Sequence, residues 1–332
     1  MASSRKLPNT DPAFPGISGA IKATAGKNVK PGQRVAVCLS GGVDSVVLLH
    51  ALITFSTCHS FPLALGAIHV NHGLQPQAGA WESFCQRLCA SFGVTYCCER
   101  VTVDKESGDG LEGAARRARQ EVFRQIDTDW LMLAHHMDDQ AETLLFNLLR
   151  GAGIQGASAM HERNGRLLRP FLAVSRSEIL AYARHHGLEW VEDESNADPQ
   201  YSRNYLRLKI IPEIAVRFPA LSRNLAAAAS RFGEAQCLLD DLARLDLGAG
   251  NDRFPLPVGV LLGMDEGHAL NALRYLLKMH QLMIPSESRL REALQQMLTA
   301  APDRHPEIVL GEMRLRRRKG QIYLERVDQT PR

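Results

Sequence analysis

Residues 35–45 read Val35-Ala36-Val37-Cys38-Leu39-Ser40-Gly41-Gly42-Val43-Asp44-Ser45. The first five form an apolar run that predicts a buried strand, and a helical pattern begins at about Val43. The two glycines between them permit a tight turn whose backbone N–H groups converge at the positive end of the helix dipole. Such a turn suits phosphate oxygens, with serine hydroxyls as further donors, and the Asp44 carboxylate indicates Mg²⁺.

The same alternation of apolar runs and helical patterns continues downstream for more than a hundred residues. We expect strands at 34–39, 63–70, 94–101 and 130–134, and helices from about 43 and at 80–92, 111–126 and 139–149. This order predicts an α/β fold with a doubly wound parallel sheet. Such sheets bind ligands at the carboxyl ends of their strands, so residues just after each strand are the first candidates for chemistry.

The chain is predicted to contain a large catalytic domain and a smaller α+β domain. Expected boundaries are 1–30 for a lead-in and first helix, 31–217 for the catalytic domain, 218–250 for a helical connector and 251–332 for the C-terminal domain. In the last segment, two strand-like runs at 307–313 and 321–325 are expected to be joined by a basic turn, RLRRRKG.

Composition excludes several classes of protein. The 332 residues are 45% hydrophobic and 23% charged, which is typical of a folded globular chain and not of a disordered or fibrous one. No apolar run approaches the roughly 18 residues of a membrane span, and the first thirty residues contain no apolar signal region, so neither membrane insertion nor export is expected. Seven cysteines without a C-x-x-C pair favour a reducing cytoplasm over a disulfide framework or zinc ribbon.

Two common nucleotide motifs are missing from the glycine turn. The lysine of G-x-x-x-x-G-K-[ST] is absent, and so is the G-x-G-x-x-G spacing. Neither γ-phosphoryl transfer nor hydride transfer is therefore indicated.

Polar residues follow two other expected strands. His69 to Leu74 reads H-V-N-H-G-L, where hydrogen-bonded turn histidines and a ligand site both remain open. After the fourth strand, Ala134 to Thr143 reads A-H-H-M-D-D-Q-A-E-T. Its acidic residues could cap the helix start, but their concentration at the ligand edge favours binding of Mg²⁺ or a substrate ammonium.

Two further segments are candidates for binding. Arg116 and Arg119 fall one turn apart on a predicted helix, as a phosphate clamp or an ordinary solvated face. Residues 150–156 read R-G-A-G-I-Q-G, and the glycine-rich stretch begins at Gly151. This segment is either a linker or a mobile cover over a bound nucleotide.

The hexapeptide Ser40–Ser45 resembles the pyrophosphate (PP) loop of the N-type ATP pyrophosphatases, which cleave ATP between its α- and β-phosphates. Later segments resemble motifs of the tRNA(Ile)-lysidine synthetases: H-V-N-H-G-L, A-A-R-x-x-R, H-x-D-D-Q-x-E-T and R-G-x-G-x-x-G. Two more matches are W-x-x-D-x-S-N at Trp190–Asn196 and R-N-x-x-R at Arg203–Arg207. The resemblance covers about 17–217 continuously. It implies an adenine nucleotide alpha-hydrolase-like fold.

The resemblance also implies a reaction and its participants. ATP adenylates the wobble cytidine of the CAU-anticodon tRNA(Ile), and L-lysine then displaces AMP to form lysidine, a carbon–nitrogen ligation that changes codon reading from AUG to AUA. The implied site residues for ATP are Ser40, Gly41, Gly42, Val43, Asp44, Ser45, His69, Arg116 and Gly151; for catalysis Asp44, His136, Asp138, Asp139 and Glu142; for tRNA Arg119, Arg203, Arg207, Arg316, Arg317 and Arg318; and for Mg²⁺ Asp44 and Asp138.

Alternatives remain open at this point. A tRNA thiolase of the same fold would adenylate a base and deliver sulfur, but its paired cysteines are missing here. A non-catalytic RNA-binding module is disfavoured because Asp44, Asp138 and Asp139 are all present. The assembly state is not determined, and a homodimer is one option.

Overall fold

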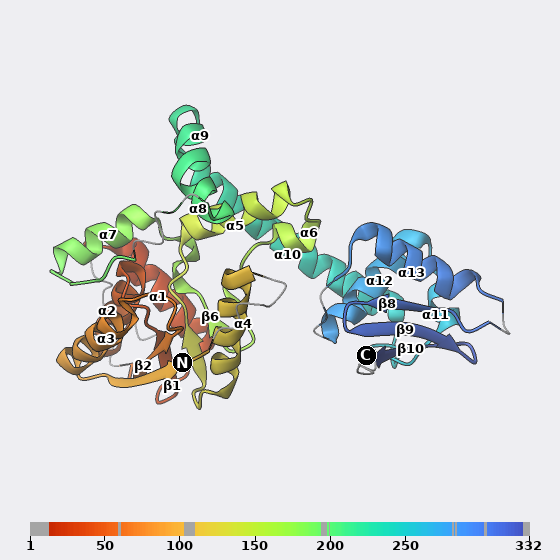
Figure 1. Ribbon diagram of the computed structural model, residues 1–332, viewed down its shortest axis with the longest axis horizontal. Coiled ribbons are helices and arrows are strands. Elements are labelled where there is room, and N and C mark those ends of the chain that lie inside the picture. The colour runs from red at the N-terminus through yellow and green to blue at the C-terminus, as the bar shows by residue number, and fades with distance from the viewer. Residues whose placement is uncertain are drawn as a thin grey trace, which may run out of the picture. The chain divides into compact units, whose positions relative to one another are not determined.

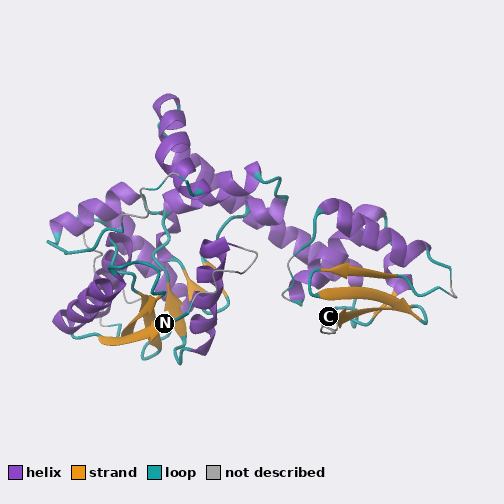
Figure 2. Cartoon of the chain, viewed as in Figure 1, coloured by secondary structure: helices purple, strands orange, loops and turns teal. Residues whose placement is uncertain are grey.

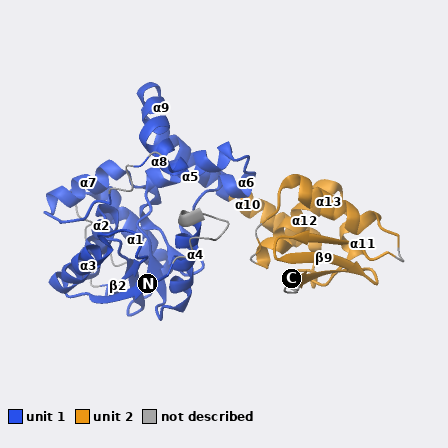
Figure 3. Ribbon diagram, viewed as in Figure 1, with its two compact units in different colours: residues 1–233 blue, residues 234–332 orange. Residues whose placement is uncertain are grey.

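The protein is described by a computed structural model that covers residues 13–58, 61–102, 110–193, 198, 200–280, 282, 284–301 and 304–327, without the side chains of 110–112. The chain forms two compact units, Met1–Gly233 and Glu234–Arg332 (Figure 3). No helix in the described ranges is long and apolar enough to cross a membrane.

The first unit is built on a six-stranded sheet with the order β3-β2-β1-β4-β6-β5 (Figures 1 and 2). Neighbouring strands pair in parallel, except that β5 is antiparallel to β6. The strands are β1 (Arg34–Cys38), β2 (Ala64–Asn71), β3 (Thr95–Arg100), β4 (Trp130–Met132), β5 (Arg163–Asn164) and β6 (Leu167–Leu168). The predicted α/β fold with a parallel sheet is confirmed.

Helices cover both faces of this sheet because alternate side chains of each strand point to opposite sides. Val35 and Val37 of β1 pack into the core that includes α1 (Pro15–Asn28), α2 (Val43–Cys58), α3 (Ala78–Phe92) and α7 (Arg176–His185). Ala36, between them, packs on the other side in a cluster with Val122 and Phe123 of α4 (Gly110–Gln125). Burial on both faces explains why β1 reads as a continuous apolar run.

The strand order creates a switch point beside β1. The chain runs from β1 outward through β2 and β3, and then returns to place β4 on the other side of β1. The chain therefore leaves the carboxyl ends of β1 and β4 in opposite directions, and doubly wound sheets bind ligands at such a switch point. The PP loop leads from β1 into α2, and the H-x-D-D-Q-x-E-T motif begins with His136, the N-cap of α5, and continues into that helix.

The hairpin β5–β6 extends the sheet beyond β4 and was not expected from the sequence. Each strand has only two residues, too few to show a two-residue period. Backbone bonds still join it to β4, since the N–H groups of Leu131 and Leu133 donate to the carbonyls of Arg166 and Leu168.

The remaining helices of the first unit follow β4 in the chain. They are α5 (Met137–Leu149), α6 (Ile154–Ala157), the 3₁₀ turn η1 (Pro170–Ala173), α7, α8 (Ser202–Tyr205), the π-helical turn η3 (Leu206–Ile210), α9 (Ile211–Arg217) and α10 (Leu221–Leu247). Contacts join α8 and η3 to α5. Helix α10 contributes Leu225 and Phe232 to a cluster of the first unit, and Ala243 and Leu247 to the core of the second.

The second unit packs helices on one face of an antiparallel sheet with the order β7-β10-β9-β8. Its elements are β7 (Leu256–Pro257), α11 (Val258–Leu262), α12 (Glu266–Met279), α13 (Glu287–Thr299), β8 (Glu307–Leu310), β9 (Met313–Arg318) and β10 (Gln321–Arg326). Leu276, Leu290, Leu315 and Ile322 are fully buried in its core.

The expected basic turn in this unit was wrong: most of RLRRRKG is strand β9. Leu315 supplies the buried face, while Arg314 and Arg316 keep their charges on the opposite face. The turns lie instead on either side of the strand, at Gly311 and Gly320, both with positive φ. A two-residue period carried by a single leucine among arginines is a weak signal.

Candidate functional site

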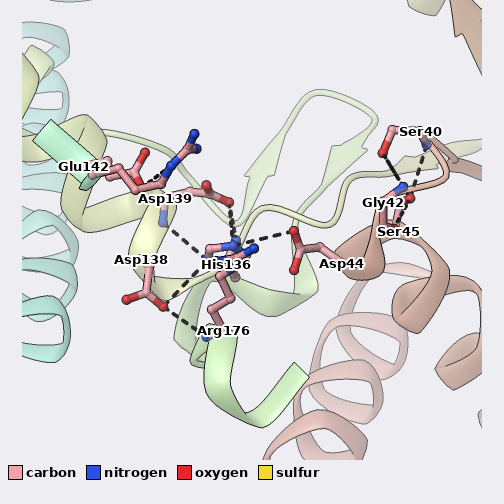
Figure 4. Close-up of polar contacts among 10 residues, drawn as sticks. Ser40, Gly42, Asp44, Ser45, His136, Asp138, Asp139, Glu142 and Arg176 are labelled. Carbon is pink, nitrogen blue, oxygen red and sulfur yellow. Dashed lines mark hydrogen bonds and ion pairs between the residues drawn. The ribbon is translucent and has the colours of Figure 1, made fainter. Parts of the chain in front are cut away.

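The PP loop is held closed by its own hydroxyl groups (Figure 4). The Ser40 N–H donates to Ser45 Oγ at 3.2 Å, and Ser45 Oγ donates to the Gly42 carbonyl at 2.9 Å. The Gly42 N–H lies 3.3 Å from Ser40 Oγ. Gly41 has a φ of +89°, and its carbonyl accepts from the Val191 N–H at 3.0 Å, so the loop is also fixed from outside.

His136 connects the two motifs that meet at the switch point. It is buried at the N-terminus of α5, where its backbone N–H donates to Asp139 at 2.9 Å and its Nδ1 accepts from the Asp139 N–H at 3.4 Å. Its Nε2 lies 3.7 Å from the Asp44 carboxylate and 3.5 Å from that of Asp139, and its Nδ1 lies 3.8 Å from Asp138 (Figure 4). The structure thus brings the four predicted residues Asp44, His136, Asp138 and Asp139 together.

One carboxylate oxygen of Asp44 could bind a cation. Its Oδ1 is buried and accepts no hydrogen bond from any residue that the structure describes. Burial raises the pKa of the Asp44 carboxyl, and Asp139 raises it further against the opposing effect of His136. A cation at Oδ1 would satisfy this oxygen and favour the ionised form.

The acidic residues fit Mg²⁺ as a shared ligand of protein and phosphate. Within the described ranges no three His, Cys, Asp or Glu side chains converge as a complete metal set. Mg²⁺ usually takes only one or two carboxylates and completes its shell with substrate phosphates and water. Asp44 therefore fits this role, whereas one oxygen of Asp138 already accepts the Arg176 N–H at 3.0 Å.

Glu142 is a buried carboxyl group one turn into α5. Burial raises its pKa to about 7, Asp139 adds to the rise, and Arg207 and Arg203 oppose it. Arg207 Nε lies 4.0 Å from Glu142 Oε1 and is held by a hydrogen bond to Asn204. A carboxyl that titrates near neutral pH is suited to accept a proton in catalysis.

The arginines of α4 act electrostatically on two histidines that follow β2 and β4. Burial lowers the pKa of His135 to about 3, with Arg169, Arg119 and Arg116 lowering it further. Burial and Arg119 likewise lower the pKa of His72. Both imidazoles are therefore neutral, and the arginines supply the positive charge at this edge.

Two predicted ATP ligands have structural positions. His69 is buried under the PP loop, where its Nδ1 donates to the Leu39 carbonyl at 2.9 Å and lies 3.7 Å from Cys85 Sγ. Gly151 has a φ of +75° and follows α5, whose 13 residues separate it from the His136 end by about 20 Å. Their roles in ATP binding stay predictions.

The predicted tRNA-binding arginines lie in both units. Arg203 stacks over Phe146 of α5, with 5.3 Å from its guanidinium carbon to the ring centroid, and Arg207 faces Glu142. In the second unit Arg316 and the exposed Arg318 lie on the outer face of β9. Arg317 points the other way and donates to the carbonyls of Met297 and Ala300 at the end of α13.

Sequence reasoning missed two arginines at the site. Arg176, at the start of α7, binds Asp138 through its backbone and acts electrostatically on Asp44. Arg169, after β6, donates from Nε to His135 Nδ1 at 3.3 Å. Neither belongs to a strand end of the predicted sheet, and only the unexpected hairpin β5–β6 brings Arg169 to this edge.

Comparison with known proteins assigns the chain to a family. A PP-loop domain matches residues 18–214, and a TilS substrate binding domain matches residues 256–323. A tRNA(Ile)-lysidine synthase of Nitrosomonas europaea is 40% identical over 338 residues, which cover 100% of this chain and 72% of the relative. The chain belongs to the tRNA(Ile)-lysidine synthase family.

Further similarities agree with this assignment. The tRNA(Ile)-lysidine synthase of Azoarcus sp. strain BH72 is 43% identical over 91% of the chain and 68% of its own length. Among solved structures, the U34-tRNA thiolase NcsA of Methanococcus maripaludis shares the fold, with a TM-score of 0.53, 21% identity, and coverage of 66% of this chain and 78% of that one. The family resemblance of the motifs is confirmed, although Ser195 and Asn196 lie outside the described residues.

Proposed function

We propose that this chain is a tRNA(Ile)-lysidine synthase, which attaches L-lysine to the wobble cytidine of the CAU-anticodon tRNA(Ile) with ATP. The observation that carries the proposal is the position of Glu142. A buried carboxyl with a pKa of about 7 lies on the helix whose first turn meets the PP loop through His136 and Asp44. The switch point of the sheet therefore has groups for adenylation, and α5 adds a base for an amine.

In the first step, the O2 atom of cytosine attacks the α-phosphorus of ATP. A P–O bond forms, the bond to the β-phosphate oxygen breaks, and pyrophosphate leaves with that electron pair. The backbone N–H groups of the PP loop and the hydroxyl of Ser40 bind the pyrophosphate portion. In this proposal Arg116 and Arg119 of α4 bind phosphates of the nucleotide or the RNA.

Asp44 is the residue that would hold Mg²⁺, with Asp138 as a second candidate. When bound, the ion neutralises charge on the phosphates. His136 lies between these carboxylates and Asp139, so its imidazole fixes their positions relative to the loop.

In the second step, the ε-amine of lysine attacks C2 of the adenylated base. A C–N bond forms, the C–O bond to the phosphate breaks, and AMP leaves. Lysine must lose a proton to attack, and ionised Glu142 both attracts the ammonium and accepts that proton. Arg207 favours the ionised carboxylate, because a nearby positive charge lowers its pKa.

The RNA is bound by arginines of both units in this proposal. Arg203 and Arg207 lie beside Glu142, and Arg316 and Arg318 form a basic surface on β9. Arg317 stays in the tRNA-binding set only as a sequence prediction, because its guanidinium is engaged at the end of α13. A tRNA substrate places the protein in the cytoplasm.

A thiolase is the second candidate from the sequence. All seven cysteines are free thiols, and burial raises the pKa of Cys85 to about 12 and that of Cys89 to about 11. Neutral, buried thiols are poor nucleophiles and poor metal ligands. Cys85 and Cys89 pack in the hydrophobic core of the first unit.

The test combines purified protein, ATP, Mg²⁺ and labelled lysine with two transcripts, the CAU-anticodon tRNA(Ile) and the elongator tRNA(Met). We expect lysine on cytidine of the first transcript only, by nucleoside mass spectrometry, and one AMP and one pyrophosphate for each lysine. AMP and pyrophosphate without lysine would indicate another nucleophile. Absence of all products would contradict the proposal.

A further inference from the structure

A pair of tyrosines lies on the surface of the helical segment next to the proposed site. Tyr201, which caps α8, and Tyr205, at its end, are 43% and 48% exposed. The Tyr205 N–H donates to the Tyr201 carbonyl at 2.9 Å, so the two residues are one helical turn apart. Leu208, at 39% exposure, continues this face into the π-helical turn η3.

The opposite face of the same helix is directed at the reaction centre. Arg203 stacks over Phe146, and Arg207 lies 4.0 Å from Glu142. These residues are two positions from the tyrosines, about 200° around the helix. The tyrosine face is therefore about one helix diameter, roughly 10 Å, from Glu142. The reacting base occupies the Glu142 side, so the tyrosines can meet only other parts of the substrate.

The segment carries an excess of positive charge. Between residues 201 and 217 the cationic side chains are Arg203, Arg207, Lys209 and Arg217, and the one described acidic side chain is Glu213. Exposed aromatic rings among cations match the chemistry of unpaired nucleotides, whose bases stack on rings while their phosphates attract the charges. This charge pattern is unfavourable for a basic or strictly apolar protein partner.

We propose that Tyr201 and Tyr205 form a stacking platform for unpaired bases of the anticodon loop that neighbour the reacting cytidine. The proposal rests on the proposed function, because it takes the anticodon loop as the substrate at Glu142. Stacking there fixes the loop on one side of α8 while the cytidine reaches the other. The platform accepts any base, since every base has a flat face, so it positions the loop without reading its sequence.

The test measures binding of a fluorescent anticodon stem-loop of the CAU tRNA(Ile) to the full chain. The double variant Tyr201→Ala/Tyr205→Ala is expected to bind at least about tenfold more weakly, since one stacked base contributes about 5- to 150-fold by alanine substitution. Tyr201→Phe/Tyr205→Phe keeps both rings and is expected to stay within about twofold of the wild type. Both variants are expected to bind ATP and to unfold thermally as the wild type does, because the side chains are exposed.

Phe218→Ala is the matched control. Phe218 is 61% exposed on the same segment but follows α9, beyond the tyrosine face. We expect its affinity for the stem-loop to equal that of the wild type. An equal loss in Phe218→Ala would show general apolar adhesion and overturn the assignment to the tyrosine pair.

Two other results would overturn the proposal. One is a phenylalanine variant that binds as weakly as the alanine variant. The other is unchanged stem-loop binding in the alanine double variant; if its sedimentation changes at the same time, the face is a contact between copies of the chain. Lysine incorporation by the wild type is measured in parallel. If it is absent, the proposed function fails on its own, whatever the tyrosine variants show.

Discussion

Glu142 shows how the surroundings of a single residue change its pKa. The side chain is almost fully buried in α5, near Asp139 and across from Arg207. Burial and Asp139 raise its pKa, and the arginine limits the rise. The result is a carboxyl that is largely ionised at slightly alkaline pH and protonated in mild acid.

The first prediction concerns the pH dependence of lysine transfer. The rate should rise with pH through about 7 as Glu142 ionises. In Arg207→Ala the acidic limb should move to higher pH, because the arginine lowers the Glu142 pKa. Lysine-dependent kcat/KM measured from pH 5.5 to 9 checks this, with Lys209→Ala as the control for lost charge on the same segment. An unshifted limb in Arg207→Ala would remove Glu142 from the base role.

The second prediction concerns stability at the same residue. A carboxyl whose folded pKa is about 7 binds protons more tightly when folded, so its favourable contribution is complete below its unfolded pKa and is lost as pH rises through about 7. Glu142→Gln should therefore be more stable than the wild type at pH 8, by about 3 kcal/mol, and nearly equal to it at pH 4.5. Urea unfolding at both pH values checks this. Lysine transfer should fall by about 10²- to 10⁴-fold.

At the scale of elements, the PP loop depends on one glycine conformation. Gly41 has a φ of +89°, and a Cβ there would lie 2.8 Å from Val191 Cγ2 and 3.3 Å from Cys85 Sγ. Gly42 has an ordinary φ, and a Cβ would meet only Ser40 Oγ at 3.5 Å. The two glycines of the motif therefore have different tasks, which the sequence alone does not distinguish.

The third prediction follows from this difference. Gly41→Ala should reduce the free energy of unfolding by about 1–3 kcal/mol through backbone strain, and should also weaken ATP binding as the loop is displaced. Gly42→Ala, the matched control, should unfold like the wild type. Thermal unfolding and ATP titration of both variants check this. Equal stability of the two variants would contradict the strained position of Gly41.

Neighbouring arginines of β9 lie on opposite faces of the strand and make different contacts. Arg317 lies on the inner face with Leu315 and donates to the carbonyls of Met297 and Ala300 at 2.9 and 3.0 Å. Arg318 is exposed and stacks over Tyr323. A run of like charges in the sequence thus divides into a helix cap and a surface.

The fourth prediction tests this division. Arg317→Ala should destabilise the second unit by about 1–3 kcal/mol, because charged hydrogen bonds to the end of α13 are lost. Arg318→Ala should change stability by less than about 0.5 kcal/mol, as exposed cation–π contacts are weak. Urea unfolding monitored by circular dichroism compares them. If Arg317→Ala keeps full stability and loses tRNA affinity, the sequence prediction for Arg317 is right and the capping role is wrong.

At the scale of the whole molecule, positive charge is concentrated in a few places although the net charge is small. The net charge is only +3, yet arginines gather on β9 and around α8. On β9, Arg314 and Arg316 lie within 4.0 Å of Glu325 and Glu307, so part of their charge is compensated within the sheet. If these surfaces bind RNA as proposed, the attraction depends on a few side chains.

The fifth prediction concerns the salt dependence of tRNA binding. Replacing Arg316 and Arg318 by Gln should weaken binding and flatten the slope of log K against log salt by about 1.4–1.8, as expected for two lost phosphate contacts. Binding at several salt concentrations measures both effects. The Tyr201→Phe/Tyr205→Phe variant, which keeps every charge, should retain the wild-type slope. An unchanged slope in the arginine variant would remove β9 from the RNA surface.

The sequence by itself determined the α/β class and the residues at the strand ends, because buried parallel strands and glycine turns have local signals that need no partner. It also brought Asp44, His136, Asp138 and Asp139 forward as one site through their motifs. The order of strands, the hairpin β5–β6 and the two missed arginines Arg169 and Arg176 were decided only by the tertiary structure.

The physical reason is that these features depend on contacts between distant segments. Two-residue strands exist because β4 offers backbone groups for pairing. Glu142 has its raised pKa because packing buries its carboxyl, and Arg207 of η3, which lies against α5, limits the rise. The direction of the Arg317 side chain likewise depends on its hydrogen bonds to the end of α13. The exposure of Tyr201 and Tyr205 depends on Arg203, whose stacking over Phe146 turns the opposite face of the segment toward α5. Residue types and periods limit what each segment can do, and packing selects which of those possibilities is realised.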